Sequence, residues 1–475
     1  MTFARRQQRV GNGALPVRAS RFVVDFADPI ASIQPWYVGL GCSMYGRIAT
    51  TSTEQAAAER ALDARYMRLP VKWDGTQAVS AAAGSAATPI KPLVDLYRSW
   101  GYHVHIIISG RDGDFANYVS GDAAAIVGQL GTDSSIEYSG PNEPWLDGAT
   151  TQDVIDRGIV LYDELQTVAA GKKLWGPVHY AYVTSDLEAY MDGMGAARID
   201  GVEYHNYAMG STALATQVAF AQTSQYEQQV GALRLAAQQR AIDDNVAVSE
   251  LNFSWRSNDG TPEEMGGFVS PKSGQLINGR LFTAVNTVWM ASAIGHILAA
   301  GGRAIPYANQ NQALGIMVQN DYTGDTGDVP GANGVQRANS SPMPAYWGIA
   351  AWTGAGEPDL SAEPSAQTAR FSHFNDTMYR TELATGDTDI EVFALNNESG
   401  GYNLVAINKH ETSSCRLTIE LSNATVTVYD AWMSRAGAYP AAFTAPRKVA
   451  TGQPITASTI TLALDACTVS TIVLS

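Results

Sequence analysis

The chain has 475 residues, more than one ordinary domain holds, so two domains are expected. Hydrophobic residues make up 45% of it and 44 residues are glycine, which is typical of a well-packed fold with many turns. The formal net charge of -15 argues against nucleic acid as a partner, because phosphates attract Lys and Arg.

The N-terminal segment and one apolar run bear on membranes and export. Residues 1–6 carry positive charge, but no apolar stretch follows them, so they are not a signal peptide as written. Residues 281–300 form the longest uncharged apolar run, which is long enough to cross a bilayer. Because Asn286 and His296 interrupt this run, we expect a buried helix there and no membrane span.

The region between residues 36 and 355 alternates short apolar runs with longer Ala-rich segments, a pattern that indicates βα units and a parallel sheet. The predicted strands cover residues 37–41, 66–71, 103–108, 136–138, 173–177, 201–207, 246–252 and 303–308. Helices are expected at 53–64, after the first strand, and at 345–352, after the last. Eight strand–helix pairs predict an α/β fold of the (β/α)8 barrel type, the TIM barrel.

A doubly wound open sheet is the main alternative to the barrel. Such a sheet usually carries a Gly-rich phosphate-binding turn after its first strand. Here Gly39 and Gly41 lack the third glycine of that turn, so we interpret them as packing residues and expect no nucleotide cofactor.

The residue pattern changes after about residue 365, where runs of alternating apolar and polar residues replace helical segments. These runs indicate strands at short spacing and predict a β-sandwich. The expected strands cover residues 390–395, 402–408, 415–419, 425–429 and 468–474, with a hairpin turn at 397–401. The strand-like residues 21–26 are expected to join the sandwich. The predicted division is therefore 1–30 as an N-terminal strand segment, 31–360 as the barrel and 361–475 as the sandwich, packed rigidly together.

Two glutamates mark the ends of separate predicted barrel strands. Glu143 stands in Asn142-Glu143-Pro144 after the fourth strand, and Glu250 lies near the end of the seventh. Catalytic residues of such barrels lie at the C-terminal ends of the strands, and strands four and seven face each other across the barrel mouth. Paired carboxyl groups suit glycoside hydrolysis, because one protonates the leaving oxygen while the other attacks the sugar or activates water.

These motifs resemble those of retaining glycoside hydrolases of the large barrel superfamily whose acid/base and nucleophile glutamates end strands four and seven. Arg68 on strand two and the pair His205 and Tyr207 on strand six match further positions of that pattern. A barrel followed by a sandwich is similar to the β-xylosidase/α-iduronidase group and the glucuronidase/heparanase group. The resemblance covers the whole chain in architecture, but in motif only these strand ends.

The resemblance implies a role for each of these groups. Glu143 would be the general acid and then the general base, with a pKa raised by burial or a nearby negative charge. Glu250 would be the nucleophile, kept ionised by Arg68 and the hydroxyl of Tyr207. An exposed loop acid for Glu143, a buried structural acid for Glu250 and a barrel salt bridge for Arg68 are the alternatives.

Further residues are expected to bind the sugar. Asn142 would hydrogen-bond the 2-hydroxyl, and His205 would shape the same subsite unless it is a core histidine. Trp73, Trp145 and Tyr307 are candidates for stacking on a sugar ring, with core packing as the alternative. Other candidates near strand ends are Trp255, Asp112 and Asp114, while Asn309 and Gln310 stand where many relatives have a tryptophan. By strand alternation Glu203 shares a face with His205, and Glu137 shares one with Glu143; both are expected to be structural.

The remaining expectations concern metals, thiols and partners. The Cys and His residues show no metal-ligand spacing, so neither a metal nor another cofactor is expected. Cys415 and Cys467 either form a disulfide or, with Cys42, are buried free thiols. The expected partner is an oligo- or polysaccharide, and the expected place of action is outside the cell or at its surface. A non-catalytic carbohydrate-binding protein and a virion-associated glycan-binding protein on the same scaffold are the alternative functions.

Overall fold

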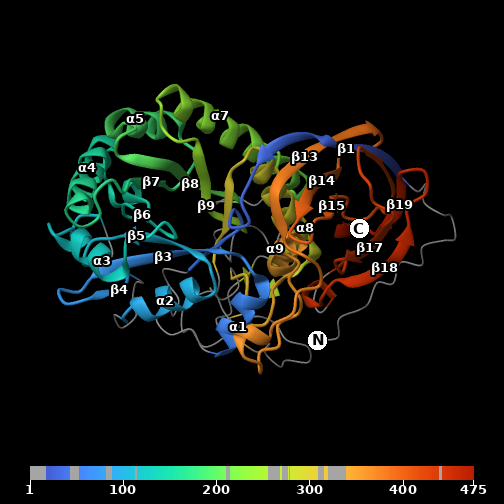
Figure 1. The fold of residues 1–475 in the computed structure, drawn as a ribbon, viewed down its shortest axis with the longest axis horizontal. Helices are drawn as coiled ribbons and strands as arrows, with labels where there is room; N and C mark the ends of the chain where they lie inside the picture. The colour runs from blue at the N-terminus through green and yellow to red at the C-terminus, as the bar shows by residue number, and fades with distance from the viewer. Residues whose placement is uncertain are drawn as a thin grey trace.

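The computed structural model describes residues 18–42, 53–81, 88–112, 115–209, 214–254, 268–269, 276–277, 279–308, 315–318, 339–437 and 441–475. Two bodies of β structure lie side by side, one built of parallel strands ringed by helices and one built of strands alone (Figure 1). The predicted barrel and the separate sheet domain are thus confirmed.

The barrel strands are β2 (Leu40–Gly41), β3 (Tyr66–Trp73), β5 (His103–Ile108), β6 (Ile136–Ser139), β7 (Leu174–His179), β8 (Ile199–Met209), β9 (Asn245–Ser254) and β12 (Arg303–Pro306). Each pairs in parallel with the next in this order. Parallel bridges from Val38 to Ala304 and from Gly41 to Tyr307 bring the first strand against the last and close the ring. The short β4 (Ala78–Ser80) is added antiparallel to β3.

Helices follow the barrel strands and cover their outer faces, as βα units require. They are α1 (Thr53–Leu62), α2 (Lys91–Ser99), α3 (Asp122–Leu130), α4 (Thr151–Val168), α5 (Thr184–Met194), α6 (Thr216–Gln222), α7 (Gln225–Gln239), α8 (Ala284–Ala299) and α9 (Pro344–Thr353). Helix α8 is buried along most of its length, as expected for residues 281–300. None of the described helices is long and apolar enough to cross a membrane.

Gly39 is a packing residue in the barrel. A Cβ atom added there would lie 2.6 Å from the carbonyl oxygen of Tyr66, so no side chain fits between the two strands. The interpretation of this glycine as a close-approach position, rather than part of a phosphate-binding turn, agrees with that contact.

The second body is a nine-stranded sheet in the order β18-β17-β20-β15-β14-β13-β1-β16-β19, whose strands enclose a separate apolar core. The strands are β1 (Arg18–Ser32), β13 (Phe374–Thr385), β14 (Ile390–Asn397), β15 (Tyr402–Asn408), β16 (Cys415–Ser422), β17 (Val428–Met433), β18 (Arg447–Pro454), β19 (Thr459–Leu464) and β20 (Thr468–Leu474). Strand β1, from the N-terminal end of the chain, pairs antiparallel with β13 and parallel with β16. A small hairpin, β10 (Phe268–Val269) with β11 (Leu276–Ile277), belongs to neither body.

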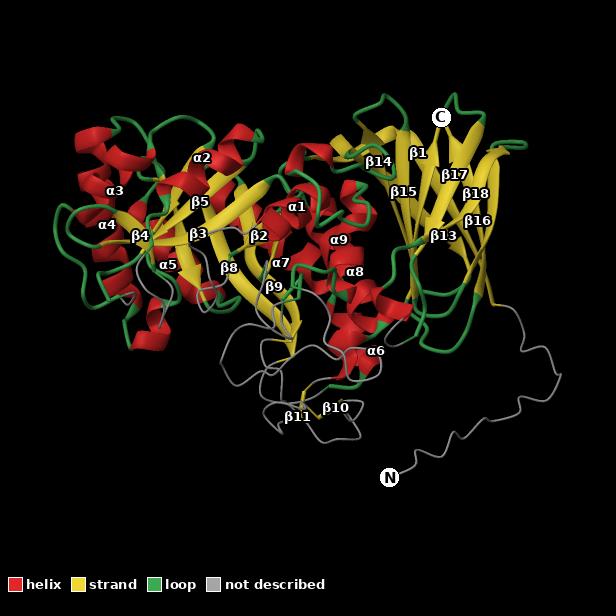
Figure 2. Cartoon of the chain, turned by 90° about the horizontal axis from the view of Figure 1, so that it is seen from below, coloured by secondary structure: helices red, strands yellow, loops and turns green. Residues whose placement is uncertain are grey.

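Helices α8 and α9 lie between the barrel strands and the second sheet in both views (Figures 1 and 2). The packing is close at Gly295 of α8, where an added Cβ would lie 2.6 Å from the ring of Phe393 on β14. Thr471 on β20 donates a hydrogen bond to the carbonyl of Ala351 on α9 (2.8 Å). Side chains from both bodies therefore share one interface.

The three cysteines are buried and free in the structure. Cys415 lies in the core of the second sheet, whereas Cys467 packs with the core that contains the barrel. Of the two alternatives considered for Cys415 and Cys467, the structure has the free thiols.

Candidate active site

Glu143 follows β6 and begins the short 3-10 turn Pro144–Asp147. Its backbone has φ 48° and ψ 45°, the left-handed region that costs a residue with a side chain about 1 kcal/mol or more. The backbone N–H of Glu143 donates to the carbonyl of Val178 at the end of β7 (3.0 Å), which anchors the strained residue. The side chain is thus aimed from a fixed position beside the strand ends.

Glu250 owes its orientation to a β-bulge in β9. The consecutive residues Tyr204 and His205 of β8 pair with Val248 and Glu250, so Ser249 is an extra residue. Glu250 therefore lies directly across from His205, and both side chains point into the barrel. Strict alternation along β9 would have put Ser249 and Glu250 on opposite faces.

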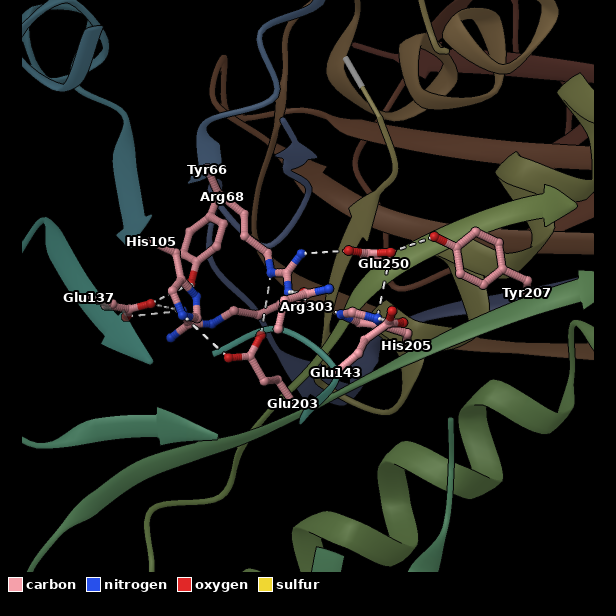
Figure 3. Close-up of polar contacts among 11 residues, drawn as sticks. Tyr66, Arg68, His105, Glu137, Glu143, Glu203, His205, Tyr207, Glu250 and Arg303 are labelled. Atoms are coloured by element: carbon pink, nitrogen blue, oxygen red, sulfur yellow. Dashed lines mark hydrogen bonds and ion pairs between the residues drawn. The ribbon is translucent and has the colours of Figure 1, made fainter. Parts of the chain in front are cut away.

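The two carboxylates meet at the mouth of the barrel (Figure 3). A carboxylate oxygen of Glu143, a ring nitrogen of His205 and a carboxylate oxygen of Glu250 all lie within 4.8 Å of one another. The Glu143 side chain is 24% exposed and that of Glu250 is 7% exposed. One carboxylate is thus reachable from solvent while the other is nearly buried.

Arg68 on β3 holds this group together from below. Its Nη1 donates to Oε1 of Glu250 (3.0 Å), and its Nη2 donates to Oδ1 of Asn142 (2.7 Å). The hydroxyl of Tyr207 donates to the other oxygen of Glu250 (2.6 Å). Burial, and then the charge of Glu250, raise the pKa of Tyr207 well above its usual value, so this hydroxyl keeps its proton. Glu250 is accordingly held by a hydrogen-bond donor on each of its two oxygens.

The protonation of His205 follows from its two partners. Nη2 of Arg68 lies 3.0 Å from Nε2 of His205, and because a guanidinium can only donate, Nε2 must accept. The ring proton is therefore on Nδ1, which lies 2.6 Å from Oε1 of Glu143 and donates to it. In this arrangement His205 is a hydrogen-bond donor aimed at Glu143.

The pKa of Glu143 is lowered, whereas the sequence led us to expect it raised. Burial does raise it, but His205 foremost, and then Arg68 and His179, outweigh that effect. The expectation was wrong because it counted burial and a neighbouring negative charge, and missed a hydrogen-bond donor on the acid itself.

The aromatic candidates fall in different places. The ring of Trp145 lies 4.1 Å from that of His179, at the end of β7, and is half-buried. Tyr307 follows β12 and acts electrostatically on Tyr207. Trp73 is half-buried on β3 beside β4, and among the described residues no hydrogen bond or ring contact joins it to the glutamates. Asp112 accepts a hydrogen bond from Asn117, a local loop contact. Trp255, Asp114, Asn309 and Gln310 lie outside the described residues.

A layer of charged side chains beneath the glutamates was largely missed from the sequence. It contains Glu203 and Glu137, which were expected to be structural, together with Tyr66, His105 and Arg303, for which no role was expected from the sequence. The available signal was polar residues at alternate positions of strands that are otherwise apolar, such as Tyr66 and Arg68 on β3.

Two groups of side chains within the described ranges have the donor set for a metal ion. One is Glu143 with His205 and Glu250, and the other is Asp387 with Asp389 and His410. In the first, the Nδ1 proton of His205 already bridges to Glu143, and Arg68 lies against Glu250 and His205. In the second, Arg18 binds both Asp387 and His410. A guanidinium next to each set fits a divalent cation poorly, because like charges repel at this range.

Comparisons with known proteins support the fold. No protein-family model and no curated protein sequence matches the chain. Among solved structures, a xyloglucanase of glycoside hydrolase family 44 from Paenibacillus polymyxa is 13% identical with a TM-score of 0.65, covering 96% of this chain and 100% of its own. CelM2, a bifunctional glucanase-xylanase from a metagenome library, is 14% identical with a TM-score of 0.62, covering 96% and 99%.

A GH51 arabinofuranosidase from Xanthomonas axonopodis pv. citri is likewise 13% identical, with a TM-score of 0.62 and coverage of 96% and 100%. The chain therefore shares the barrel and second sheet domain of these proteins along almost its whole length. At such identity the likeness establishes the fold alone, and the two groups named from the sequence remain a prediction.

Proposed function

We propose that the protein is a retaining glycoside hydrolase that cleaves an oligo- or polysaccharide by double displacement. The observation that carries the proposal is the meeting of Glu143 and Glu250, from β6 and β9, with carboxylate oxygens within 4.8 Å of each other. Retaining enzymes hold their two carboxyl groups about 5 Å apart, whereas inverting enzymes need room for a water molecule between them. The solved structures of similar fold, described as a xyloglucanase, a glucanase-xylanase and an arabinofuranosidase, support the same class.

In the first step Glu143 gives its proton to the leaving oxygen while an oxygen of Glu250 bonds to the anomeric carbon and the glycosidic bond breaks. In the second step Glu143 takes a proton from water, the water oxygen bonds to the anomeric carbon, and the bond to Glu250 breaks. Arg68 and Tyr207 stabilise the Glu250 carboxylate that leaves. Asn142 accepts from Arg68 through Oδ1, so its amide N–H groups are the part of this side chain that would donate to a substrate hydroxyl.

The lowered pKa of Glu143 shapes the pH dependence. The acid must be protonated for the first step, so kcat/KM falls as pH rises through the pKa of Glu143. Because that pKa is lowered in the free protein, we expect activity to lie on the acidic side. A sugar that covers the 24% of the side chain still exposed raises this pKa by desolvation and restores part of the acid form.

The proposed catalytic unit is residues 31–360, with residues 361–475 packed on it.

The proposed site requires no metal. Arg68 supplies the positive charge that a divalent cation would otherwise bring to Glu250 and His205. Dialysis against EDTA should therefore leave turnover unchanged.

Azide rescue tests the roles of the two glutamates. Glucan, xylan, xyloglucan and aryl glycosides, including an arabinofuranoside, form the substrate panel. Glu250→Ala should abolish turnover of every substrate, because no covalent intermediate can form. Glu143→Ala should keep the first step for good leaving groups and slow the second. Glu382→Ala, on an exposed residue of β13, is the matched control and should behave as the wild type.

The stereochemistry of the glycosyl azide decides the assignment. Azide should give the retained product with Glu143→Ala and the inverted product with Glu250→Ala. Opposite outcomes would reverse the two roles, and wild-type rates in both variants would put the catalytic site elsewhere. No sugar release by the wild type over the whole panel would favour a non-catalytic carbohydrate-binding protein.

A further inference from the structure

Acidic and basic side chains alternate down the inside of the barrel beneath the two glutamates (Figure 3). In order from the mouth they are Glu250, Arg68, Glu203, His105, Glu137 and Arg303, with Tyr66 between His105 and Glu137. They come from β9, β3, β8, β5, β6 and β12, so the line crosses the lumen from strand to strand. Barrel interiors of this type are usually filled by apolar branched side chains, which makes a line of charges unusual.

Glu203 is the middle member of this line and is completely buried. Its Oε2 lies 3.6 Å from Nε of Arg68, and its Oε1 lies 3.4 Å from Nε2 of His105. Within the described part of the chain, neither oxygen of Glu203 has a hydrogen bond of good geometry. Burial raises its pKa, but the charges of His105 and Arg68 outweigh this and lower the pKa to about 2. Glu203 is thus held as an anion by charge.

Donor and acceptor counting fixes how His105 contacts Tyr66. Tyr66 donates its hydroxyl proton to Glu137 (2.5 Å), which also accepts a hydrogen bond from Nη1 of Arg303 (2.7 Å). With that proton committed, Nδ1 of His105 must donate to the hydroxyl oxygen of Tyr66 (2.6 Å). Its Nε2 faces Oε1 of Glu203 at 3.4 Å. Glu203 is therefore flanked by a basic side chain on each side, Arg68 and His105.

The arrangement is costly for stability. A buried anion without good hydrogen bonds costs several kcal/mol, and apolar residues of similar volume often stabilise a protein more than a buried ion pair does. Apolar packing alone would have been the more stable filling. Stability therefore does not account for Glu203, whose charged neighbour on the side of the two glutamates is Arg68.

We propose that Glu203 is a positioning residue for the reaction, a conclusion that rests on the proposed glycosidase function. By attracting Nε, it sets the rotation of the Arg68 guanidinium, so that Nη1 faces Glu250 and Nη2 faces Asn142 and His205. Arg68 in turn holds the nucleophile Glu250 in place. Through its contact with Nε2 of His205, it also fixes the tautomer in which Nδ1 of His205 donates to Glu143. One buried carboxylate thereby orients both catalytic glutamates through one arginine.

Glu203→Gln tests the proposal, because it keeps the shape and removes the charge. We expect kcat to fall by about 10- to 100-fold, the loss typical when a residue that orients a directly acting group is replaced. KM should stay within about threefold of the wild-type value. Removing a negative charge also lowers the pKa values of nearby carboxyl groups. The acidic limb of the pH profile, where kcat/KM falls as pH decreases, should therefore shift to lower pH by about half a unit.

Two further variants separate charge from shape and from general loss of structure. Glu203→Asp keeps the charge and should keep the acidic limb of the wild type. Glu391→Gln removes another ion-paired carboxylate, 13% exposed, at the contact between barrel and second sheet, and should leave both limbs of the profile in place. Far-ultraviolet circular dichroism and melting curves for all variants report whether each is folded.

The outcomes are distinct. If the wild type turns over no glycan, the proposed function fails before Glu203 is tested. If the wild type is active, a folded Glu203→Gln variant with kcat within about threefold of it would overturn the inference. An unmoved acidic limb, or an equal loss in Glu391→Gln, would also overturn it by showing a purely structural role.

Discussion

Glu203 in the barrel and Glu391 at the contact with the second sheet are both buried carboxylates flanked by a histidine and a longer cationic side chain. In each, burial by itself would raise the pKa of the carboxyl group. The neighbouring basic side chains outweigh that effect and lower the pKa to about 2. Glu391 is fully hydrogen-bonded: Ser292 donates to Oε2 (2.6 Å), and His296 (3.0 Å) and Lys409 bind Oε1. Glu203 has ion-pair contacts to Arg68 and His105 and lies near the side chain of Ser249, but within the described ranges neither of its oxygens has a hydrogen bond of good geometry.

The surroundings of the cations differ in the same way. Lys409 also donates to the carbonyl of Phe220 (3.2 Å) and the hydroxyl of Thr223 (2.9 Å), so its bonds join residues of the two bodies. Arg68 instead directs the hydrogen bonds of its two terminal nitrogens to Asn142, His205 and Glu250. A saturated cluster locks a contact, whereas an incompletely paired one leaves its charge acting on the site above it. The comparison predicts that one cluster serves stability and the other serves the reaction.

Replacing Arg68 by lysine should give the largest effect. Lysine keeps the charge but loses the planar fork that reaches Glu250 and Asn142 together. We expect kcat/KM to fall by about 10³-fold, or about 4 kcal/mol of transition-state stabilisation, measured on the best substrate of the panel. A loss of less than about tenfold would show that the charge alone is needed and would weaken the contrast with Lys409.

Replacing Glu391 by glutamine should act on stability. The substitution leaves Lys409 buried without its anionic partner, which should lower the free energy of unfolding by about 3 kcal/mol. Urea denaturation followed by tryptophan fluorescence measures this change, and kcat of the folded fraction should stay at the wild-type value. A variant of unchanged stability but reduced kcat would reverse the assignment of the two clusters.

His296 should make the interface sensitive to pH, with the smallest effect. Its Nδ1 lies 2.9 Å from Glu227 and its Nε2 lies 3.0 Å from Glu391, so both nitrogens donate. Burial lowers its pKa, but these two carboxylates outweigh burial and the charge of Lys409, and raise it.

A raised folded-state pKa gives stability that is full below the unfolded value of about 6.5 and is lost as pH rises through the folded value. The free energy of unfolding should therefore decline above neutral pH, by at most about 1.4 kcal/mol per pH unit for one proton. Urea midpoints between pH 6 and 9 measure the slope, and His296→Gln should remove it. A slope that persists in His296→Gln would assign the titration to another group.

Much of the barrel could be predicted because its signals are local. Each of its eight strands lies where an apolar run stood between helical segments, although the first shortens to β2 (Leu40–Gly41). The second sheet was harder. Strand β18 (Arg447–Pro454) is exposed along its length, so it has no alternation of apolar residues to find. The predicted strand at 425–429 begins three residues early relative to β17 (Val428–Met433), because residues 424–427 have no regular secondary structure.

The sequence by itself determined which strands carry Glu143 and Glu250, since a glutamate after an apolar run at a strand end is visible in one dimension. Only the tertiary structure decided how these side chains face. The bulge at Ser249 turns Glu250 inward beside His205, and no local pattern of residues encodes it. The line from Arg68 through Glu203 to His105 joins three strands whose relative height depends on the stagger of the closed barrel. The lowered pKa of Glu143 has the same origin, because its cause, a donor on His205, lies 62 residues away in the chain and 2.6 Å away in space.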